Sequence, residues 1–290
     1  MQFSRPTAEL WIPDNTPEDV ALARTTHMAI GAHQDDLEIM AFEGILAGYG
    51  LKDKWFLGVV MTDGASSARA GLPGSNLYAN YSDEEMKAVR RAEQKKAAVI
   101  GEYTAQALLD HPSASVKDAE NRAPVEDVKK LLEASRPEVV YLHNLADKHA
   151  THIAVSLRCI AALRELPKEQ RPKRVVGCEV WRDLDWLVDS DKVVFRLDHH
   201  ENLAWALIGV FDSQIEGGKR YDVATIGRRR AHATYHESRV VDANSMLNFG
   251  MDLTPLIEDD TLDISKYVLS HVDRFRQDVA SNLAAFASRK

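Results

Sequence analysis

Two clusters of histidine and carboxylate side chains are the residues of this 290-residue chain whose types and spacing suit chemistry. The first, His33-Gln34-Asp35-Asp36, follows a short apolar run at the point where a helical pattern begins. Carboxylates at such a position often only cap the helix, because its first N–H groups and the positive end of its dipole stabilise negative charge. Taken alone, this cluster is as consistent with capping as with catalysis.

A second cluster of histidine and carboxylate residues favours a catalytic or metal-binding role over helix capping. The apolar run 138–142 is followed by His143, Asn144, Asp147, His149 and His152. His149 and His152 are three residues apart, so both imidazoles project from one face if a helix has begun there. If both apolar runs are strands of one parallel sheet, the two clusters lie at the same edge and can converge. Two His/Asp clusters at two strand ends predict a metal site.

Imidazole and carboxylate ligands without thiolate suit a catalytic Zn²⁺ that has three protein ligands and one open position. We expect one zinc ion per chain, bound by His33, Asp36 and His152, although another divalent ion also suits these ligands. Asp35 would lie beside the ion without binding it, where it can take a proton from a bound water. His149 would face the developing oxyanion or the leaving amine.

The elements that must position these residues alternate between strands and helices. Strands are predicted at 27–32, 55–61 and 138–142, and helices at 37–46, 82–101, 124–135 and 150–163. The segment 64–81, rich in Gly, Ser and Asn, is predicted to be a surface loop at the strand ends. This alternation predicts an α/β fold with a doubly wound, mostly parallel sheet and helices on both faces.

The pattern changes after Pro167. Strands at 174–181 and 192–197, a helix at 201–211 and a terminal helix at 264–288 then form a C-terminal extension. The segment 167–172 carries too little Gly or Ser for a flexible linker. We therefore expect a single domain made of an N-terminal arm (1–24), a metal-binding core (25–165) and a C-terminal part (166–290) that completes the substrate cleft.

The composition excludes several other classes of protein. Hydrophobic residues make up 45% and charged residues 28%, which are globular values. The net charge of -8 disfavours nucleic acid and anionic membranes as partners. Cys159 and Cys178 form no CxxC pair, and no run approaches the ~20 apolar residues of a membrane helix. We expect a cytoplasmic protein without a membrane span, and the sequence leaves assembly into a homo-oligomer open.

Several short motifs, taken in order, resemble those of the PIG-L/LmbE-like deacetylases. Ala32-His33-Gln34-Asp35-Asp36 resembles the AHPDD signature of that family, and His149-Ala150-Thr151-His152 resembles its HPDH motif. Val60–Gly64 is similar to the family's second strand and turn, and Arg90-Arg91-Ala92-Glu93 to its R-x-x-E helix. Asp212-Ser213-Gln214 weakly resembles a later SQ element. The similarity spans roughly residues 25 to 165.

The resemblance implies a Rossmann-like fold and zinc-dependent removal of an N-acetyl group from an N-acetylglucosamine-type sugar or conjugate. Carried over position by position, it implies metal ligands at His33, Asp36 and His152, a general base at Asp35, and a polarising or acid-donating histidine at His149. Gln34 departs from the family proline. Thr151 replaces an aspartate expected to tune His149, so we hypothesise that Asp147 supplies that carboxylate instead.

The signals for substrate binding are weaker. Arg90 is a candidate for contacting a sugar hydroxyl or phosphate, but a helix that starts with three acids also favours basic residues on its solvated face. His200 follows a predicted strand and either lines the cleft or starts a helix. For Lys219-Arg220 and Arg228-Arg229-Arg230, a solvated or subunit-contact face is favoured over contact with an anionic substrate. Trp181, Trp186 and Trp205 suit the core better than a sugar-stacking role.

Other classes of function fit these residues less well. A serine hydrolase is disfavoured, because Gly64-Ala65-Ser66-Ser67-Ala68 lacks the second glycine of a G-x-S-x-G elbow. A metal-dependent phosphoesterase acting on a sugar phosphate is one alternative, but such sites usually need a second metal. A non-catalytic sugar-binding or regulatory protein with a residual metal site is another, and the presence of Asp35 argues against it. Neither G-x-G-x-x-G nor a P-loop occurs, which excludes a dinucleotide-binding protein.

Overall fold

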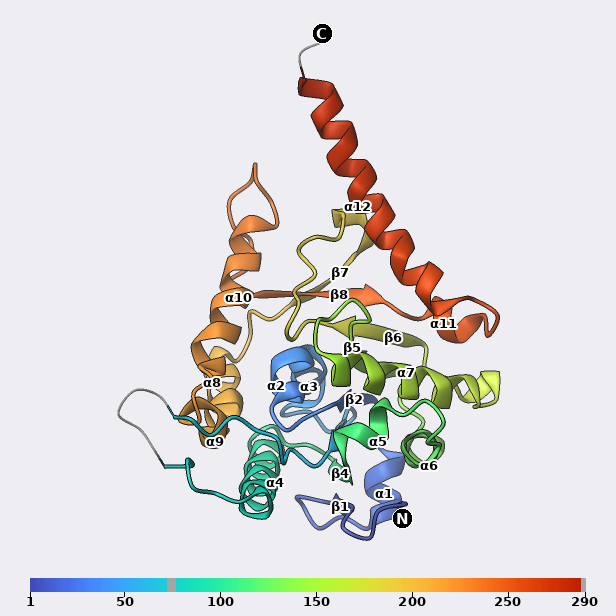
Figure 1. Ribbon diagram of the computed structural model, residues 1–290, viewed down its shortest axis with the longest axis vertical. Helices are drawn as coiled ribbons and strands as arrows, with labels where there is room; N and C mark the ends of the chain where they lie inside the picture. Colours follow the sequence, from blue (N-terminus) through green and yellow to red (C-terminus); the bar gives the residue numbers. More distant parts are fainter. Residues whose placement is uncertain (72–76, 288–290) are drawn as a thin grey trace.

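The computed structural model describes residues 1–71 and 77–287, and in this part of the chain eight strands form one sheet (Figure 1). The strand order is β1-β4-β3-β2-β5-β6-β8-β7. The strands are β1 (Glu9–Trp11), β2 (His27–Gly31), β3 (Phe56–Thr62), β4 (Ala105–His111), β5 (Val139–His143), β6 (Arg174–Cys178), β7 (Lys192–Arg196) and β8 (Leu247–Asp252).

The five central strands, β4, β3, β2, β5 and β6, run parallel. β1 pairs antiparallel with β4, and β8 pairs antiparallel with both β6 and β7. The predicted α/β class with a mostly parallel sheet is therefore confirmed. β2 and β5 are direct neighbours, with Ala29 opposite Tyr141, so the carboxyl ends of these two strands meet at one edge.

Helices cover both faces of the sheet. The α-helices of the described residues are α1 (Glu18–Ala23), α2 (Asp36–Met40), α3 (Phe42–Gly48), α4 (Asp83–Ile100), α5 (Ser113–Lys117), α6 (Ala123–Ser135), α7 (Ala150–Arg164), α8 (Glu201–Gly209), α9 (Asp212–Ile215), α10 (Tyr221–Tyr235), α11 (Pro255–Glu258) and α12 (Ile264–Phe286). Alternate residues of β2 enter different cores, because successive side chains of a strand point to opposite faces. Met28 and Ile30 pack with α6 and α7, whereas Ala29 packs with α3, α4 and α8.

The helix predicted at 37–46 is interrupted at Ala41, which separates α2 from α3. In a continuous helix, the backbone carbonyls before the break would accept hydrogen bonds from backbone N–H groups four residues later. Here they accept from a side chain instead. Arg229 Nη2, from α10, donates to the carbonyls of Glu38 at 2.8 Å and Ile39 at 3.1 Å. The residue that stabilises this break lies almost two hundred positions away in the chain, so the local pattern could not indicate it.

Eight of the described strands and α-helices were not predicted from the sequence: β1, β4, β8, α1, α5, α9, α10 and α11. The N-terminal arm was expected only to pack on the surface, but its strand β1 extends the sheet at the edge of β4. The strand predicted at 174–181 ends at Cys178. Part of the loop predicted at 64–81, residues 72–76, lies outside the described residues.

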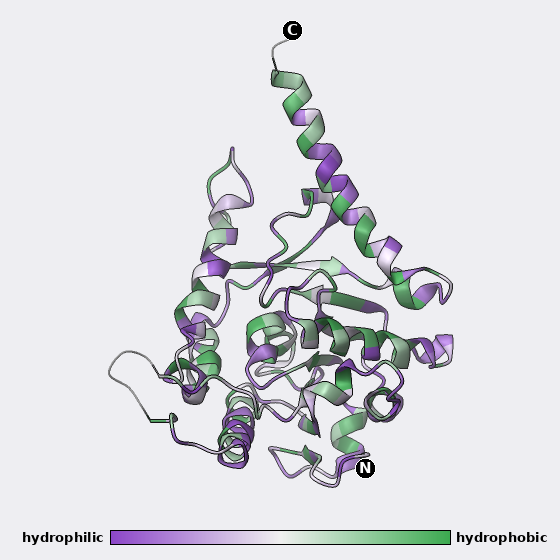
Figure 2. Cartoon of the chain, viewed as in Figure 1, coloured by the Kyte–Doolittle hydropathy of each residue, from purple (hydrophilic) through white to green (hydrophobic). Residues whose placement is uncertain are grey.

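The terminal helix α12 projects from the body of the protein (Figure 1). Its start packs on the core through Tyr267 and Val268, and Arg274 pairs with Asp191. Apolar and polar residues alternate in bands along the projecting part (Figure 2), and Leu283 and Phe286 are exposed there. The helix was predicted to reach Ser288, which lies outside the described residues. Among the described helices, none has the length and apolar character needed to cross a membrane.

Candidate metal centre

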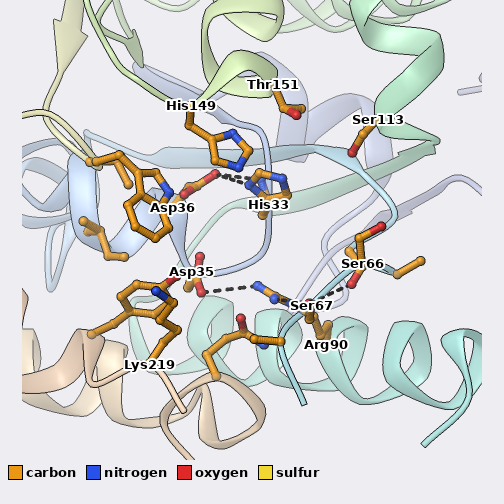
Figure 3. A pocket seen from close by; sticks show the side chains of 18 of the residues that line it. His33, Asp35, Asp36, Ser66, Ser67, Arg90, Ser113, His149, Thr151 and Lys219 are labelled. Atoms are coloured by element: carbon orange, nitrogen blue, oxygen red, sulfur yellow. Dashed lines mark hydrogen bonds and ion pairs between the residues drawn. The ribbon is translucent and has the colours of Figure 1, made fainter. Parts of the chain in front are cut away.

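The side chains of the two predicted clusters meet at the carboxyl edge of β2 and β5 (Figure 3). His33 and Asp36 follow β2, and His152 lies in the first turn of α7, which follows β5. His33 Nδ1 lies 3.2 Å from Asp36 Oδ2, His152 Nε2 lies 3.4 Å from the same oxygen, and the two nitrogens are 3.3 Å apart. Three candidate ligand atoms thus form a nearly equilateral triangle.

The size of this triangle fits a metal ion. Ligands bound to Zn²⁺ at 2.0–2.1 Å in a tetrahedron stand about 3.3–3.4 Å from one another. The side chain of His152 is completely buried and that of Asp36 nearly so, whereas His33 is 23% exposed toward the pocket. Two overlapping groups of residues could hold an ion: His33, His149 and His152, or Asp36, His143 and His152. The donor set fits a divalent metal with an open side.

The Asp147 carboxylate contacts the imidazole of His152, whereas the sequence predicted that it would act on His149. Its Oδ2 lies 3.1 Å from Nδ1 of His152, whereas its contact with His149 is to the backbone N–H. The side-chain hydrogen bond of Asp147 therefore goes to His152 and not to His149. Burial lowers the pKa of His149, and the Asp147 charge opposes this shift. A carboxylate only accepts hydrogen bonds, so Nδ1 of His152 carries the proton and Nε2 keeps a lone pair for the metal.

His143 is a buried residue of the centre to which the sequence assigned no role. Its ring stacks on that of His152, with centroids 3.8 Å apart and planes 21° apart. The backbone N–H of Ala32 donates to Nε2 of His143 at 2.9 Å, which occupies the lone pair that would bind a metal. Burial lowers the pKa of His143 to about 4. We interpret His143 as a neutral support beneath the ligand His152.

Asp35 lies beside the triangle in a strained conformation. Its φ of +92° is in the left-handed region, which costs a non-glycine residue of order 1–3 kcal/mol. Although Asp35 precedes α2, its side chain caps no backbone N–H of that helix. Its backbone N–H donates to Gln94 Oε1 at 3.3 Å, and its Oδ2 accepts from Arg90 at 3.3 Å. Burial raises the pKa of Asp35 well above its usual range, and the Arg90 charge opposes this shift.

Arg90 is not on a solvated face, so that alternative is wrong. Its side chain is 3% exposed and lines the pocket, where Nη1 donates to Ser67 Oγ at 2.5 Å and Nη2 to the carbonyl of Gln34. One turn further along α4, Glu93 accepts hydrogen bonds from the backbone N–H and the hydroxyl of Ser213, at 2.7 and 2.6 Å. The R-x-x-E and SQ motifs are therefore joined in space, and Gln214 also lines the pocket.

His200 is not brought to the centre. It precedes α8 with a φ of +55°, its side chain is exposed, and its ring packs edge-on against Tyr49 with centroids 5.1 Å apart. It is not among the residues that line the pocket. The helix-start alternative describes His200, and its expected place in the cleft is wrong.

The pocket above the centre has a volume of about 350 Å³. Trp181 forms part of its wall and stacks on His149, with ring centroids 6.0 Å apart, although the sequence favoured a core position. Lys219 also lines it, with Nζ 5.0 Å from the Trp181 ring. Arg229 is completely buried. For Arg229, the favoured solvated or subunit-contact face is therefore wrong, whereas Lys219 is exposed and also borders the pocket.

An α/β protein with a His/Asp centre at the carboxyl edge of its parallel strands is the class that this fold and site define. Residues 28–163 match the family model of PIG-L, described as GlcNAc-PI de-N-acetylase. This part of the chain, which contains both clusters, therefore resembles the PIG-L family in sequence, as its motifs indicated. No curated protein matches the chain in sequence.

Several solved structures share the fold. The N,N'-diacetylchitobiose deacetylase of Pyrococcus horikoshii superposes with a TM-score of 0.60 and 15% identity, covering 87% of this chain and 92% of its own. The conserved protein TT1542 of Thermus thermophilus has a TM-score of 0.59 and 18% identity, covering 82% and 98%. GalB, the 4-carboxy-2-hydroxymuconate hydratase of Pseudomonas putida, has a TM-score of 0.55 and 16% identity, covering 79% and 95%. At these identities the likeness establishes a common fold.

Proposed function

We propose that this protein is a metal-dependent hydrolase that removes the N-acetyl group from an N-acetylglucosamine-type sugar or sugar conjugate. The match to a family described as a de-N-acetylase and the fold shared with a chitobiose deacetylase support this proposal. The observation that carries it is the triangle of His33, Asp36 and His152 with a separate carboxylate, Asp35, beside it. A closed structural site would have no use for that carboxylate.

His33, Asp36 and His152 would hold the ion, for which Zn²⁺ is the best fit to the donor set, one per chain. When bound, the ion supplies Lewis acidity toward the amide carbonyl and toward a water molecule. Asp35 accepts the proton of the attacking water, because it lies next to the ligands without being one of them. Arg90 holds the Asp35 carboxylate in place and favours its ionised form.

His149 acts on the other side of the acetamide. One of its ring nitrogens lies within 4.8 Å of the ligand nitrogens of His33 and His152, close enough to reach a substrate atom bound between them. From there it donates a hydrogen bond to the developing oxyanion or a proton to the leaving amine. Stacking on Trp181 keeps the imidazole plane fixed while it does so.

The two other functions considered gain less support. Both groups of residues that could hold an ion include His152, so the described residues offer one centre and no second metal for phosphoryl transfer. A residual, non-catalytic centre would not need a carboxylate held in a strained backbone conformation by a buried arginine. Strain of this kind is retained where the surrounding structure uses it.

An acetate-release assay over a panel of N-acetylglucosamine derivatives tests the proposal. We expect acetate from the native protein and none from protein stripped of metal by a chelator. Asp35→Asn should lower kcat by about 10²–10⁴-fold, the usual contribution of a general base, while metal content stays the same. Asp53→Asn, a change at an exposed residue, is the matched control. Metal uptake with no acetate from any substrate would contradict the proposal, and phosphate release would favour the phosphoesterase.

A further inference from the structure

The pocket contains more positive charge than its own carboxylates neutralise. Three cationic side chains, Arg90, Lys117 and Lys219, and two carboxylates, Asp35 and Asp36, line it. Asp35 pairs with Arg90, and the Asp36 carboxylate lies within 3.4 Å of three imidazoles. Within residues 1–71 and 77–287, neither lysine has a carboxylate at ion-pair distance. Two cationic groups without a counter-charge therefore border a cleft in a protein of net charge -8.

One wall of the pocket adds hydroxyl groups to this charge. Ser113 and Lys117 are four residues apart in α5, so they lie on the same face of that helix, and both line the pocket. Ser66, which follows β3, lines the same side, as Figure 3 shows for Ser66 and Ser113. The hydroxyls of these two serines make no hydrogen bond to other described residues, whereas that of Ser67 is used by Arg90 and the Gly64 carbonyl. An ammonium and two free hydroxyls suit an oxygen anion.

The opposite wall suits the sugar ring. Trp181 presents an aromatic face next to His149, and Lys219 lies across the pocket from Ser66 and Ser113 (Figure 3). Aromatic faces pack well against the apolar face of a ring while its edges make polar contacts. The ammonium groups of Lys117 and Lys219, which have no carboxylate partner among the described residues, make the field positive beside them and attract ligands of the opposite sign.

We infer that the substrate is an acetylated amino sugar that carries an anionic substituent, a phosphate or a carboxylate. Lys117, Ser66 and Ser113 bind the anion, and Lys219 adds positive field from the other wall. This inference rests on the proposed function, because it assumes that the acetamide occupies the metal centre. For Lys219 it favours contact with an anionic substrate over a solvated face, and Lys117 is a residue to which no motif assigned a role.

The first test compares anionic and neutral substrates. The panel is N-acetylglucosamine, its 1-phosphate, its 6-phosphate and its carboxymethyl glycoside, with kcat/KM measured by acetate release at low and high salt. We expect kcat/KM for at least one anionic compound to exceed that for the neutral sugar by about 10-fold or more. A hydrogen bond to a charged group contributes a free energy of this size. The advantage should shrink as salt rises. The phosphates and the glycoside distinguish the two kinds of anion.

Variants locate the anion site. Lys117→Gln should lower the ratio of anionic to neutral kcat/KM about 10-fold, and Ser113→Ala should lower it less. Lys52→Gln removes the same charge from an exposed residue that precedes β3, at the opposite edge of the sheet, and should leave the ratio unchanged. A ratio that Lys117→Gln and Lys219→Gln do not alter would overturn the inference, because the lysines would then be merely solvated.

A binding measurement separates this inference from the proposed function. Calorimetry with metal-loaded protein compares glucosamine with its 1-phosphate and 6-phosphate, which require no turnover. Tighter binding of a phosphate that Lys117→Gln abolishes, without acetate from any substrate, would support the anion site and refute the deacetylase. Equal turnover of neutral and anionic compounds, with equal binding, would support the deacetylase and refute the anion site.

Discussion

Replacing Asp147 with asparagine tests how the metal centre is built, because every contact of this carboxylate is defined. Oδ1 accepts from the backbone N–H groups of Lys148 at 2.6 Å, His149 at 3.3 Å and Arg182 at 3.1 Å. Oδ2 lies 3.4 Å from the backbone nitrogen of Trp181 and 3.1 Å from His152 Nδ1. An asparagine must point its NH₂ group at one of these two sets of donors.

The amide oxygen of the introduced asparagine is expected at the position of Oδ1, since three N–H groups converge there. Its NH₂ group then faces Nδ1 of His152, which can no longer be a donor. The imidazole must place its proton on Nε2, the nitrogen 3.4 Å from Asp36, and loses the lone pair that would bind the metal. Changing such a supporting carboxylate typically weakens metal binding 10- to 100-fold, or by about 1.4–2.7 kcal/mol.

The assay is competition for Zn²⁺ against a chromophoric chelator, with circular dichroism to show that the metal-free variant is folded. Asp147→Ala gives a second point, because it removes the acceptor without supplying a donor, and should bind the metal more tightly than Asp147→Asn. Asp53→Asn, at an exposed position, is the matched control. Native affinity in Asp147→Asn would refute the reasoning about the tautomer of His152.

Three further outcomes are expected. Arg229→Met should destabilise the protein by about 1–3 kcal/mol in urea unfolding, because the Glu38 carbonyl loses its donor and the Ile39 carbonyl keeps only Asn248 Nδ2 at 3.4 Å; unchanged stability would show that the break in the helix does not depend on Arg229. Arg90→Lys should lower kcat about 10-fold at unchanged zinc affinity, since an ammonium cannot contact Asp35, Ser67 and the Gln34 carbonyl together; a loss of zinc affinity would contradict this role. Burial lowers the pKa of His232 from 6.5 to about 4, so below pH 6.5 the unfolded chain binds a proton that the folded protein does not. Stability should therefore fall on acidification from pH 6.5 toward 4 by at most about 1.4 kcal/mol per pH unit from this residue, and His232→Gln should flatten the profile by about one proton. Identical profiles would show that His232 does not titrate in this way.

Much of the central sheet could be predicted because its strands are short apolar runs that end in polar residues. β4 was missed for a physical reason. Ala105-Gln106-Ala107-Leu108-Leu109 consists of good helix formers, and burial of all seven residues of the strand between β1 and β3 overrides that preference. The helical spacing of apolar residues in α10 is interrupted by Arg228-Arg229-Arg230. Hydropathy alone assigns arginine to the surface, so it could not indicate that Arg229 is buried.

The candidate centre could be predicted because parallel strands end at one edge, so two clusters far apart in the chain converge. Spacing could not show which imidazole Asp147 contacts. The orientation of the Asp147 side chain depends on a turn in which the backbone N–H groups of residues 148 and 149 both donate to its Oδ1. The roles of His143 and Lys117 depend on packing between elements, and no local spacing indicates either one.

The two hydrogen bonds from Ser213 to Glu93 join α4 to α9, two neighbouring helices that each contribute residues to the pocket. Arg90 of α4 forms an ion pair with Asp35. The segment that begins at Ser213 contributes Gln214 and Lys219 to the lining of the pocket. Because each bond to the carboxylate is worth about 1.5–3 kcal/mol, a ligand that could enter only by moving α9 away from α4 would have to break both. The opening of the pocket should thus have a fixed width, so that sugars are selected by size before the reaction begins.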